Sequence, residues 1–262
     1  MESLAKRIHD TKVSPESLAI FWISQAGFVF KTPAGKVIFI DPYLTDYVQR
    51  ELPEYGDGFK RIMAKNIDPE EVDADYIIST HAHQDHLDVD ALPGLLKNPR
   101  IHFIGAPDCR DVYINAGVPE DRFTILHKGE SIQLGDPKIT GIIADHGEST
   151  PDALGVLFDF DGIKVWQVGD SAYRPDLWQD MFKMKIDILL PPINGAFGNL
   201  NGIEAARLAH DAGAKVVIPC HYWMFALHYG SPAEFLEACK TYCPEVQSML
   251  LTQGELFVYS KS

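Results

Sequence analysis

The stretch at residues 79–90, "STHAHQDHLDVD", places three histidines and two aspartates within eight positions, directly after the apolar run "DYII". Such a run predicts a buried β-strand. In extended backbone, side chains two residues apart point the same way, so His81 and His83 can bind one metal ion. After a turn, Asp85 and His86 can reach a second ion, because two-metal hydrolytic sites hold their ions roughly 3.5–4 Å apart. The stretch therefore predicts half of a two-metal site at the end of a strand.

A two-metal site needs more ligands than this loop supplies, and three candidates follow other predicted strands. His146 follows "KITGIIAD", Asp170 follows "KVWQVG", and His221 follows "AKVVIPC". Taken singly, each is typical of a hydrogen-bonded loop residue. Together with the first cluster they favour metal ligands gathered at one edge of the sheets. Gly147 and Gly169 flank two of them and allow close approach of the backbone.

Composition narrows the classes of function. The chain has 262 residues and a formal net charge of −14, which disfavours binding to phosphate backbones of nucleic acids. The N-terminal residues lack the apolar core of a secretion signal, and no run is long enough to span a bilayer. Four cysteines show no disulfide framework. These features predict a cytoplasmic protein with reduced, packed thiols that binds neither nucleic acid nor membrane.

The pattern of elements predicts one domain spanning residues 1–262. β-rich runs occupy the first part of the chain, and strands alternate with helices such as "GIEAARLAHDAG" in the last part. Two blocks of strands mixed with helices indicate a layered α/β architecture. Residues 44–70 form a long polar segment, and segments of this length often act as a lid or a substrate wall.

The order H-x-H-x-D-H, then H, then G-D, then H resembles the metallo-β-lactamase superfamily of hydrolases over nearly the whole chain. Three stretches are also similar to its L-ascorbate-6-phosphate lactonase branch: "THAHQDHLDVDA", "FIGAPDCRDVYINAGVPEDRFTILHKGE" and "AKVVIPCHYWMF". The resemblance implies a four-layer αββα sandwich with the metals at one edge of the sheets. The chain is shorter than the lactonase and has Ala172 where that family has a histidine, so the substrate of the lactonase does not carry over intact.

The resemblance also assigns a role to each candidate ligand. The first ion would take His81, His83 and His146. The second ion would take Asp85, His86 and His221. Asp170 would bridge the two ions, and Asp41 in "FIDPY" would support the ligands from behind.

The chemistry expected of such a site is hydrolysis. Two divalent ions lower the pKa of a shared water, and the bridging hydroxide attacks a lactone or ester of a small, sugar-like substrate, with or without a phosphate. Asp85 and Asp170 are the candidate catalytic residues, Asp85 by steering the nucleophile and accepting a proton. Histidine-rich sites suit zinc, and mixed histidine and aspartate sites also take manganese or iron. The lactonase relatives point to manganese as well as zinc.

Five residues are candidates for substrate contact. Tyr222 and Trp223 in "HYWMF" provide bulky walls for a pocket. The backbone amides of Asn194 and Gly195 in "NGAFGN" could hold an anion, although a tight turn explains the same residues. Arg174 could bind a phosphate or carboxylate, or lie on the surface.

Other functions stay open at this point. The main alternative is a phosphodiesterase that acts on a small cyclic or lipid phosphodiester. A di-iron redox protein is disfavoured, because such relatives usually carry glutamate where this chain has His83. A non-catalytic metal-binding protein is disfavoured because all seven ligands are present. The expected partner is a small-molecule substrate, and homo-oligomer formation remains open.

Overall fold

The computed structural model describes residues 2–261, which divide into two compact units. The first unit contains the chain up to Leu126 and again from Leu251 onward, and the second contains His127–Leu250. Each unit is built on one seven-stranded sheet. The expectation of a single domain over residues 1–262 stays a prediction.

The sheet of the first unit is antiparallel at one side and parallel at the other. Its strands are β1 (Ser17–Ser24), β2 (Gly27–Lys31), β3 (Val37–Ile40), β4 (Tyr76–Ser79), β5 (His102–Gly105), β6 (Phe123–Ile125) and β14 (Leu256–Ser260). They lie in the order β14-β1-β2-β3-β4-β5-β6. Pairing is antiparallel from β14 to β3 and parallel from β3 to β6. Every residue of β1, β2 and β3 is buried, and each large apolar side chain among them contributes about 1.5–3 kcal/mol.

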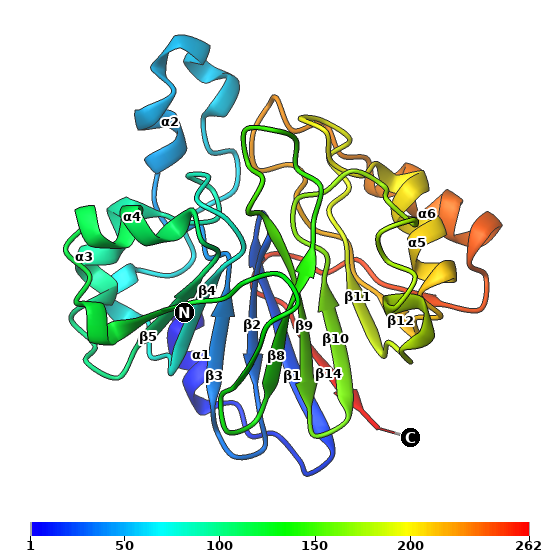
Figure 1. The fold of residues 1–262 in the computed structure, drawn as a ribbon, viewed down its shortest axis with the longest axis horizontal. Coiled ribbons are helices and arrows are strands. Elements are labelled where there is room, and N and C mark those ends of the chain that lie inside the picture. The colour runs from blue at the N-terminus through cyan, green and yellow to red at the C-terminus, as the bar shows by residue number, and fades with distance from the viewer. Residues whose placement is uncertain (1, 262) are drawn as a thin grey trace. The chain divides into compact units, whose positions relative to one another are not determined.

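Apart from the first helix, which precedes β1, the helices of this unit lie in the crossover connections between the parallel strands β3 to β6. The helices are α1 (Leu4–Asp10), α2 (Tyr47–Glu51), α3 (Leu92–Leu95) and α4 (Cys109–Asn115), with the 3₁₀ helices η1 (Pro53–Phe59), η2 (Pro69–Glu71), η3 (Val89–Ala91) and η4 (Glu120–Arg122). Figure 1 shows α3 and α4 beside β4 and β5. The polar segment 44–70 contains α2 and η1, and its role as a lid stays a prediction.

The second unit repeats this plan with a sheet of mixed pairing. Its strands are β7 (Ser131–Gln133), β8 (Lys138–Ile143), β9 (Leu154–Phe160), β10 (Ile163–Gln167), β11 (Ile188–Leu190), β12 (Val216–Val217) and β13 (Gln247–Ser248). Its helices are α5 (Gly202–Asp211), α6 (Pro232–Tyr242) and the 3₁₀ helix η5 (Met181–Lys183). The order is β13-β12-β11-β10-β9-β8-β7, antiparallel from β7 to β10 and parallel from β10 to β13.

Helix α5 begins at a capping box, which explains where the loop before it ends. The Asn201 side chain accepts hydrogen bonds from the amides of Ile203 and Glu204, and the Glu204 carboxylate accepts one from the Asn201 amide. In Figure 1, α5 and α6 lie beside β11 and β12. The loop at residues 191–201 is therefore anchored at both ends, by β11 and by the start of α5.

Gly169 lies where β10 gives way to the loop that carries Asp170. Its φ is +72°, and a Cβ atom there would lie 2.2 Å from the carbonyl oxygen of Leu154. We expect Gly169→Ala to lower the free energy of unfolding by at least about 3 kcal/mol, because backbone cannot move aside cheaply. Gly198→Ala is the matched control, since its φ is +85° but its Cβ would meet no described atom within 4 Å. It should cost about 1 kcal/mol. Equal losses in urea denaturation would contradict this account.

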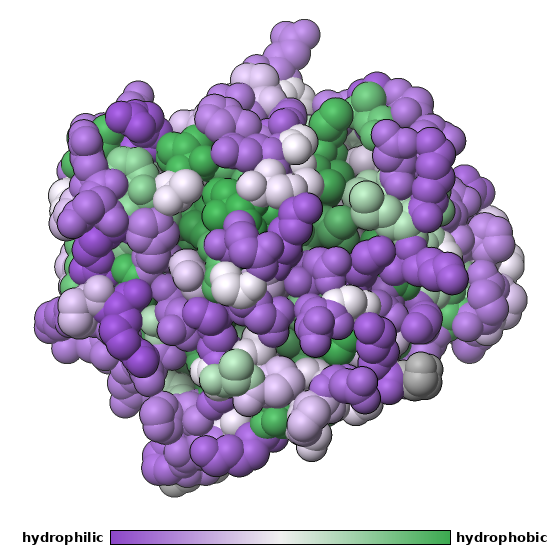
Figure 2. Space-filling model, turned by 60° about the horizontal axis from the view of Figure 1, so that its bottom comes forward, coloured by the Kyte–Doolittle hydropathy of each residue, from purple (hydrophilic) through white to green (hydrophobic). Residues whose placement is uncertain are grey.

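Charged and polar side chains dominate the surface, in line with the acidic composition. Figure 2 shows one face on which hydrophilic residues predominate and hydrophobic residues form smaller groups between them. Among residues 2–261, no helix has both the length and the apolar character needed to cross a membrane. A cytoplasmic location stays a prediction.

Candidate metal centre

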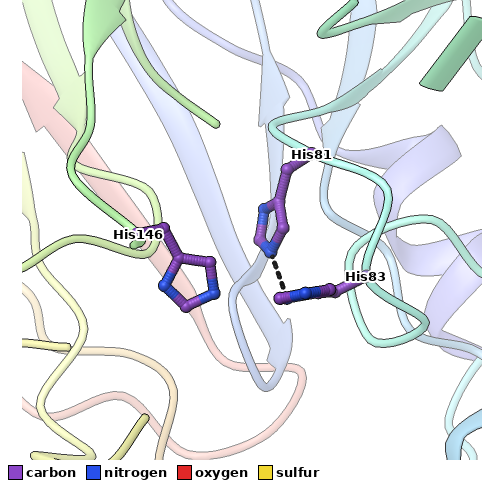
Figure 3. Close-up of side chains that lie close together, drawn as sticks. All are labelled: His81, His83 and His146. Atoms are coloured by element: carbon purple, nitrogen blue, oxygen red, sulfur yellow. Dashed lines mark hydrogen bonds between the residues drawn. The ribbon is translucent and has the colours of Figure 1, made fainter. Parts of the chain in front are cut away.

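The loop after β4 carries the first group of predicted ligands, all within the first unit. The His83 carbonyl accepts hydrogen bonds from the amides of His86 and Leu87, at 2.9 and 2.8 Å, which closes a tight turn. His81 Nε2 and His83 Nδ1 lie 2.9 Å apart and share a hydrogen bond. Figure 3 shows these two rings meeting at that bond. The predicted i, i+2 pair therefore points its nitrogens to one place.

Asp41 is a buried carboxylate that contacts Thr80 and His86 of this loop. It follows β3, and its amide donates to the carbonyl of Ile78 in the neighbouring strand at 2.8 Å. The fully buried Asp41 carboxylate accepts the amide and hydroxyl of Thr80, both at 2.8 Å, and lies 3.0 Å from His86 Nδ1. A carboxylate at Nδ1 leaves Nε2 as the atom that binds a metal. This is the supporting position that the sequence predicts for Asp41.

Asp85 lies beside the outward nitrogen of His86. Its Oδ2 atom is 3.7 Å from His86 Nε2, and its side chain is 14% exposed, so water can reach it. Oδ2 also accepts a hydrogen bond of 2.7 Å from the Gln25 side chain. Gln25 lies in the turn between β1 and β2, and its φ of 50° falls in the left-handed region. The Trp22 indole donates to the Gln25 carbonyl and so fixes that turn.

The second unit carries the other predicted ligands, which are grouped around Asp170. Asp170 Oδ2 lies 3.3 Å from His221 Nε2 and 3.7 Å from His146 Nε2. The same oxygen accepts a hydrogen bond of 2.7 Å from the Asn199 side-chain amide. All three predicted ligands are buried, and His146, labelled in Figure 3, comes from the loop after β8. One carboxylate oxygen is thus within reach of two imidazoles.

His228 extends this group beyond the predicted ligands. Its ring stacks on the His221 ring, with centroids 4.7 Å apart and planes inclined by 22°. Phe225 packs edge-on against His228 at 5.0 Å. His221 has a φ of 62°, a left-handed conformation that is strained for a histidine, and such strain clusters at functional sites. The His228 ring therefore helps to define the orientation of the His221 imidazole.

The donor atoms of both groups fit a metal. Two atoms bound to one zinc ion, each about 2.0–2.2 Å from it, lie no more than about 4.4 Å apart. The pairs His81–His83, His86–Asp85, His221–Asp170 and His146–Asp170 all satisfy this limit, at 2.9, 3.7, 3.3 and 3.7 Å. Imidazole and carboxylate donors suit zinc, manganese and iron. The chemistry of each group therefore agrees with the predicted ligand set, and the number and identity of the ions stay predictions.

The candidate substrate contacts have mixed surroundings. Tyr222 is buried, which raises the pKa of its hydroxyl, whereas Trp223 is 56% exposed. Asn194 is buried, and its side-chain amide donates to the Ala196 carbonyl at 3.3 Å, while Gly195 has a φ of 59°. Both observations agree with the tight turn that the sequence left open. Substrate contact by these residues stays a prediction.

Arg174 is occupied by two carboxylates. Its guanidinium forms a two-point pair with Asp176 and also bonds to Asp145. Hydrogen bonds to Asp176 and Asp145 raise the pKa of this guanidinium above its usual value. An anionic substrate would have to compete with both aspartates. Binding of a phosphate by Arg174 stays a prediction.

Two residues that position candidate ligands were not predicted from the sequence. Gln25 holds Asp85 from 60 positions away, and Asn199 holds Asp170 from 29 positions away. Asn199 belongs to "NGAFGN", a stretch rich in glycine and asparagine that predicts a turn. The sequence therefore indicated the turn but not the contact of Asn199 with Asp170. Gln25 follows a strand in "SQAG", a polar turn that has no distinguishing pattern.

Comparison with known proteins identifies the family of this chain. Residues 19–221 match the family described as the beta-lactamase superfamily domain. A metal-dependent hydrolase from Polynucleobacter asymbioticus is 30% identical over 254 residues, which cover 90% of this chain and 84% of that protein. A probable L-ascorbate-6-phosphate lactonase from Shigella boydii is 24% identical over 279 residues, which cover 88% of this chain and 77% of the lactonase.

A solved structure supports the fold. The metallo hydrolase from the archaeon Ignicoccus hospitalis has a TM-score of 0.71 and 20% identity, covering 94% of this chain and 100% of that one. This likeness confirms the predicted α/β fold class, that of the metallo-β-lactamases. The family match spans most of the chain and includes the ligands of both groups, from His81 to His221. The chain is therefore a member of the metallo-β-lactamase superfamily, and it is a metal-dependent hydrolase.

Proposed function

We propose that the seven predicted ligands bind two divalent ions, zinc, manganese or iron, and that the protein hydrolyses a lactone or ester of a small substrate. The observation that carries this proposal is Asp170 Oδ2. It lies within 3.7 Å of Nε2 of both His146 and His221. The family pattern assigns these two histidines to different ions, and a carboxylate oxygen beside both histidines would be shared by the two ions.

The bound ions would supply an activated water and Lewis acidity at the attacked oxygen. The protein's own residues orient the ligands and move the proton. Asp41 fixes the tautomer of His86, and Asn199 fixes the direction of the Asp170 carboxylate. Gln25 holds Asp85 where its carboxylate can accept a proton as the substrate bond breaks. No serine or cysteine nucleophile is required.

Metal content and turnover test the proposal together. Protein purified without added metal should contain about two ions per chain by elemental analysis, as a two-metal hydrolytic site requires. After loading with zinc, manganese or iron, we expect hydrolysis of simple lactones or esters, and loss of this activity with a chelator. Fewer than one ion per chain, unresponsive to added metal, would contradict a two-ion site. Turnover of bis(p-nitrophenyl) phosphate with inert lactones and esters would support the phosphodiesterase alternative instead.

A further inference from the structure

Three large aromatic side chains are exposed on two neighbouring loops of the second unit. Phe197 is 58% exposed, Trp223 56% and Tyr229 72%. Phe197 lies in the loop at residues 194–201, and the other two lie in the segment 221–231 that begins with the ligand His221. The amide of Gly230 donates to the carbonyl of Asn194 at 3.3 Å and ties the two loops together. We call Phe197, Trp223 and Tyr229 the aromatic rim.

Ring contacts connect one residue of the aromatic rim, Phe197, to the candidate metal ligand His221. The Phe197 ring packs against His228, with centroids 5.5 Å apart, and His228 stacks on His221 at 4.7 Å. Trp223 follows His221 by two residues and packs edge-on against Tyr222 at 5.6 Å. The Phe197 ring is therefore separated from the candidate ligand His221 by one ring, that of His228, and Trp223 lies in the same segment as His221.

A contribution to the stability of the fold does not explain why Phe197 and Trp223 occupy their positions. Phe197 has a φ of 55° and Trp223 a φ of 59°, both in the left-handed region that favours glycine or asparagine. Both residues are more than half exposed, so the free energy gained by burying their rings offsets little of the strain in the backbone. A bulky ring that is both strained and exposed indicates a role in binding.

The two loops lack the cationic side chains that usually bind a phosphate. Residues 194–201, "NGAFGNLN", and 221–231, "HYWMFALHYGS", contain neither lysine nor arginine. The nearest arginine along the Asp170 loop, Arg174, is held by Asp145 and Asp176. Phosphate recognition relies on cations and aligned amides, whereas exposed aromatic faces bind alkyl or aromatic groups.

We propose that the aromatic rim selects a lactone or ester that carries an uncharged alkyl or aromatic substituent, and that a phosphate is not part of the substrate. This inference rests on the proposed hydrolase function and names its substrate class. Phe197 and Trp223 are the specificity-determining residues. They contact the substituent and lie outside the group of metal ligands.

The test compares δ-decalactone, δ-valerolactone and L-ascorbate 6-phosphate with metal-loaded protein. We expect kcat/KM to be about tenfold or more higher for δ-decalactone than for δ-valerolactone, from burial of its alkyl chain. Phe197→Asn and Trp223→Asn should each lower that ratio about tenfold, mainly through KM. Asparagine suits the left-handed region, so the melting temperature should stay the same or rise, and metal content should not change. A structural role would lower the melting temperature.

Tyr242→Ala is the control, because Tyr242 is an exposed aromatic residue on α6, 37% exposed, that packs against Arg207. It should leave the ratio unchanged. A wild-type preference for L-ascorbate 6-phosphate, or a ratio that neither asparagine variant changes, would overturn the inference. If neither lactones nor esters are hydrolysed, the proposed function fails, and the binding of the hydroxy acids, measured by calorimetry, still tests the inference. Tighter binding of 5-hydroxydecanoate than of 5-hydroxypentanoate supports the rim, and equal binding refutes it.

Discussion

Replacing Asp170 by alanine is expected to remove most of the bound metal and to lower kcat/KM by about 10³-fold or more. The Asp170 carboxylate is buried, and one of its oxygens lies 3.3 Å from His221 Nε2 and 3.7 Å from His146 Nε2. Without this charge, two cations sharing the site would lose the ligand between them and repel one another. Elemental analysis and steady-state kinetics on the purified variant measure both effects.

Asn199→Ala is the matched variant for this experiment. It removes the hydrogen bond of 2.7 Å to Asp170 Oδ2 but keeps the carboxylate. Loss of a partner behind a metal ligand typically costs about 10–100-fold in metal affinity or activity, so Asn199→Ala should fall between the wild type and Asp170→Ala. Two tightly held ions and normal turnover in Asp170→Ala would refute the bridging role. Circular dichroism of both variants checks that the fold is kept.

Replacing Asp41 by alanine should weaken metal binding about 10–100-fold and lower the free energy of unfolding by about 3 kcal/mol. The buried Thr80 amide and hydroxyl would lose their acceptor, and His86 Nδ1 would lose the carboxylate that selects its tautomer. Asp41 also has a φ of 47°, which alanine tolerates less well than aspartate. Metal titration and urea denaturation measure the two effects separately.

Asp88 offers a control that separates stability from metal binding. It is a buried carboxylate near the same loop, and it accepts hydrogen bonds from the amides of Leu44 and Thr45 at 2.8 and 2.7 Å. Asp88→Ala should lower stability to a similar extent but leave the metal affinity close to that of the wild type. If both variants lose metal equally, the effect of Asp41 is general destabilisation, and its specific action on His86 is refuted.

Local patterns in the sequence predicted that His81 and His83 converge. The two residues follow β4 in a bend rather than in extended backbone, and their ring nitrogens still lie 2.9 Å apart. The tight turn that follows places Asp85 beside His86. The strand runs were equally clear, because β1, β2 and β3 are buried throughout and so read as continuous apolar segments. Such features depend on neighbours in the chain.

Long-range contacts lay beyond sequence reasoning. Gln25 and Asp85 meet because β1 and β4 belong to one sheet, although 60 positions separate them. Asp145 and Asp176 pair with the Arg174 guanidinium, and the sequence around Arg174 shows no sign of the pair with Asp145. The His228 stack on His221 depends on how the loop folds back over seven residues.

The sequence by itself determined the family, and it predicted the types and order of the metal ligands, because metal chemistry requires particular side chains at short spacings after strands. The tertiary structure decided which polar groups hold those ligands and which aromatic rings stand exposed beside them. The reason is physical. A hydrogen-bond partner or a strained, exposed ring is chosen by packing between distant segments, and many residues of similar polarity in the sequence would satisfy the same local pattern.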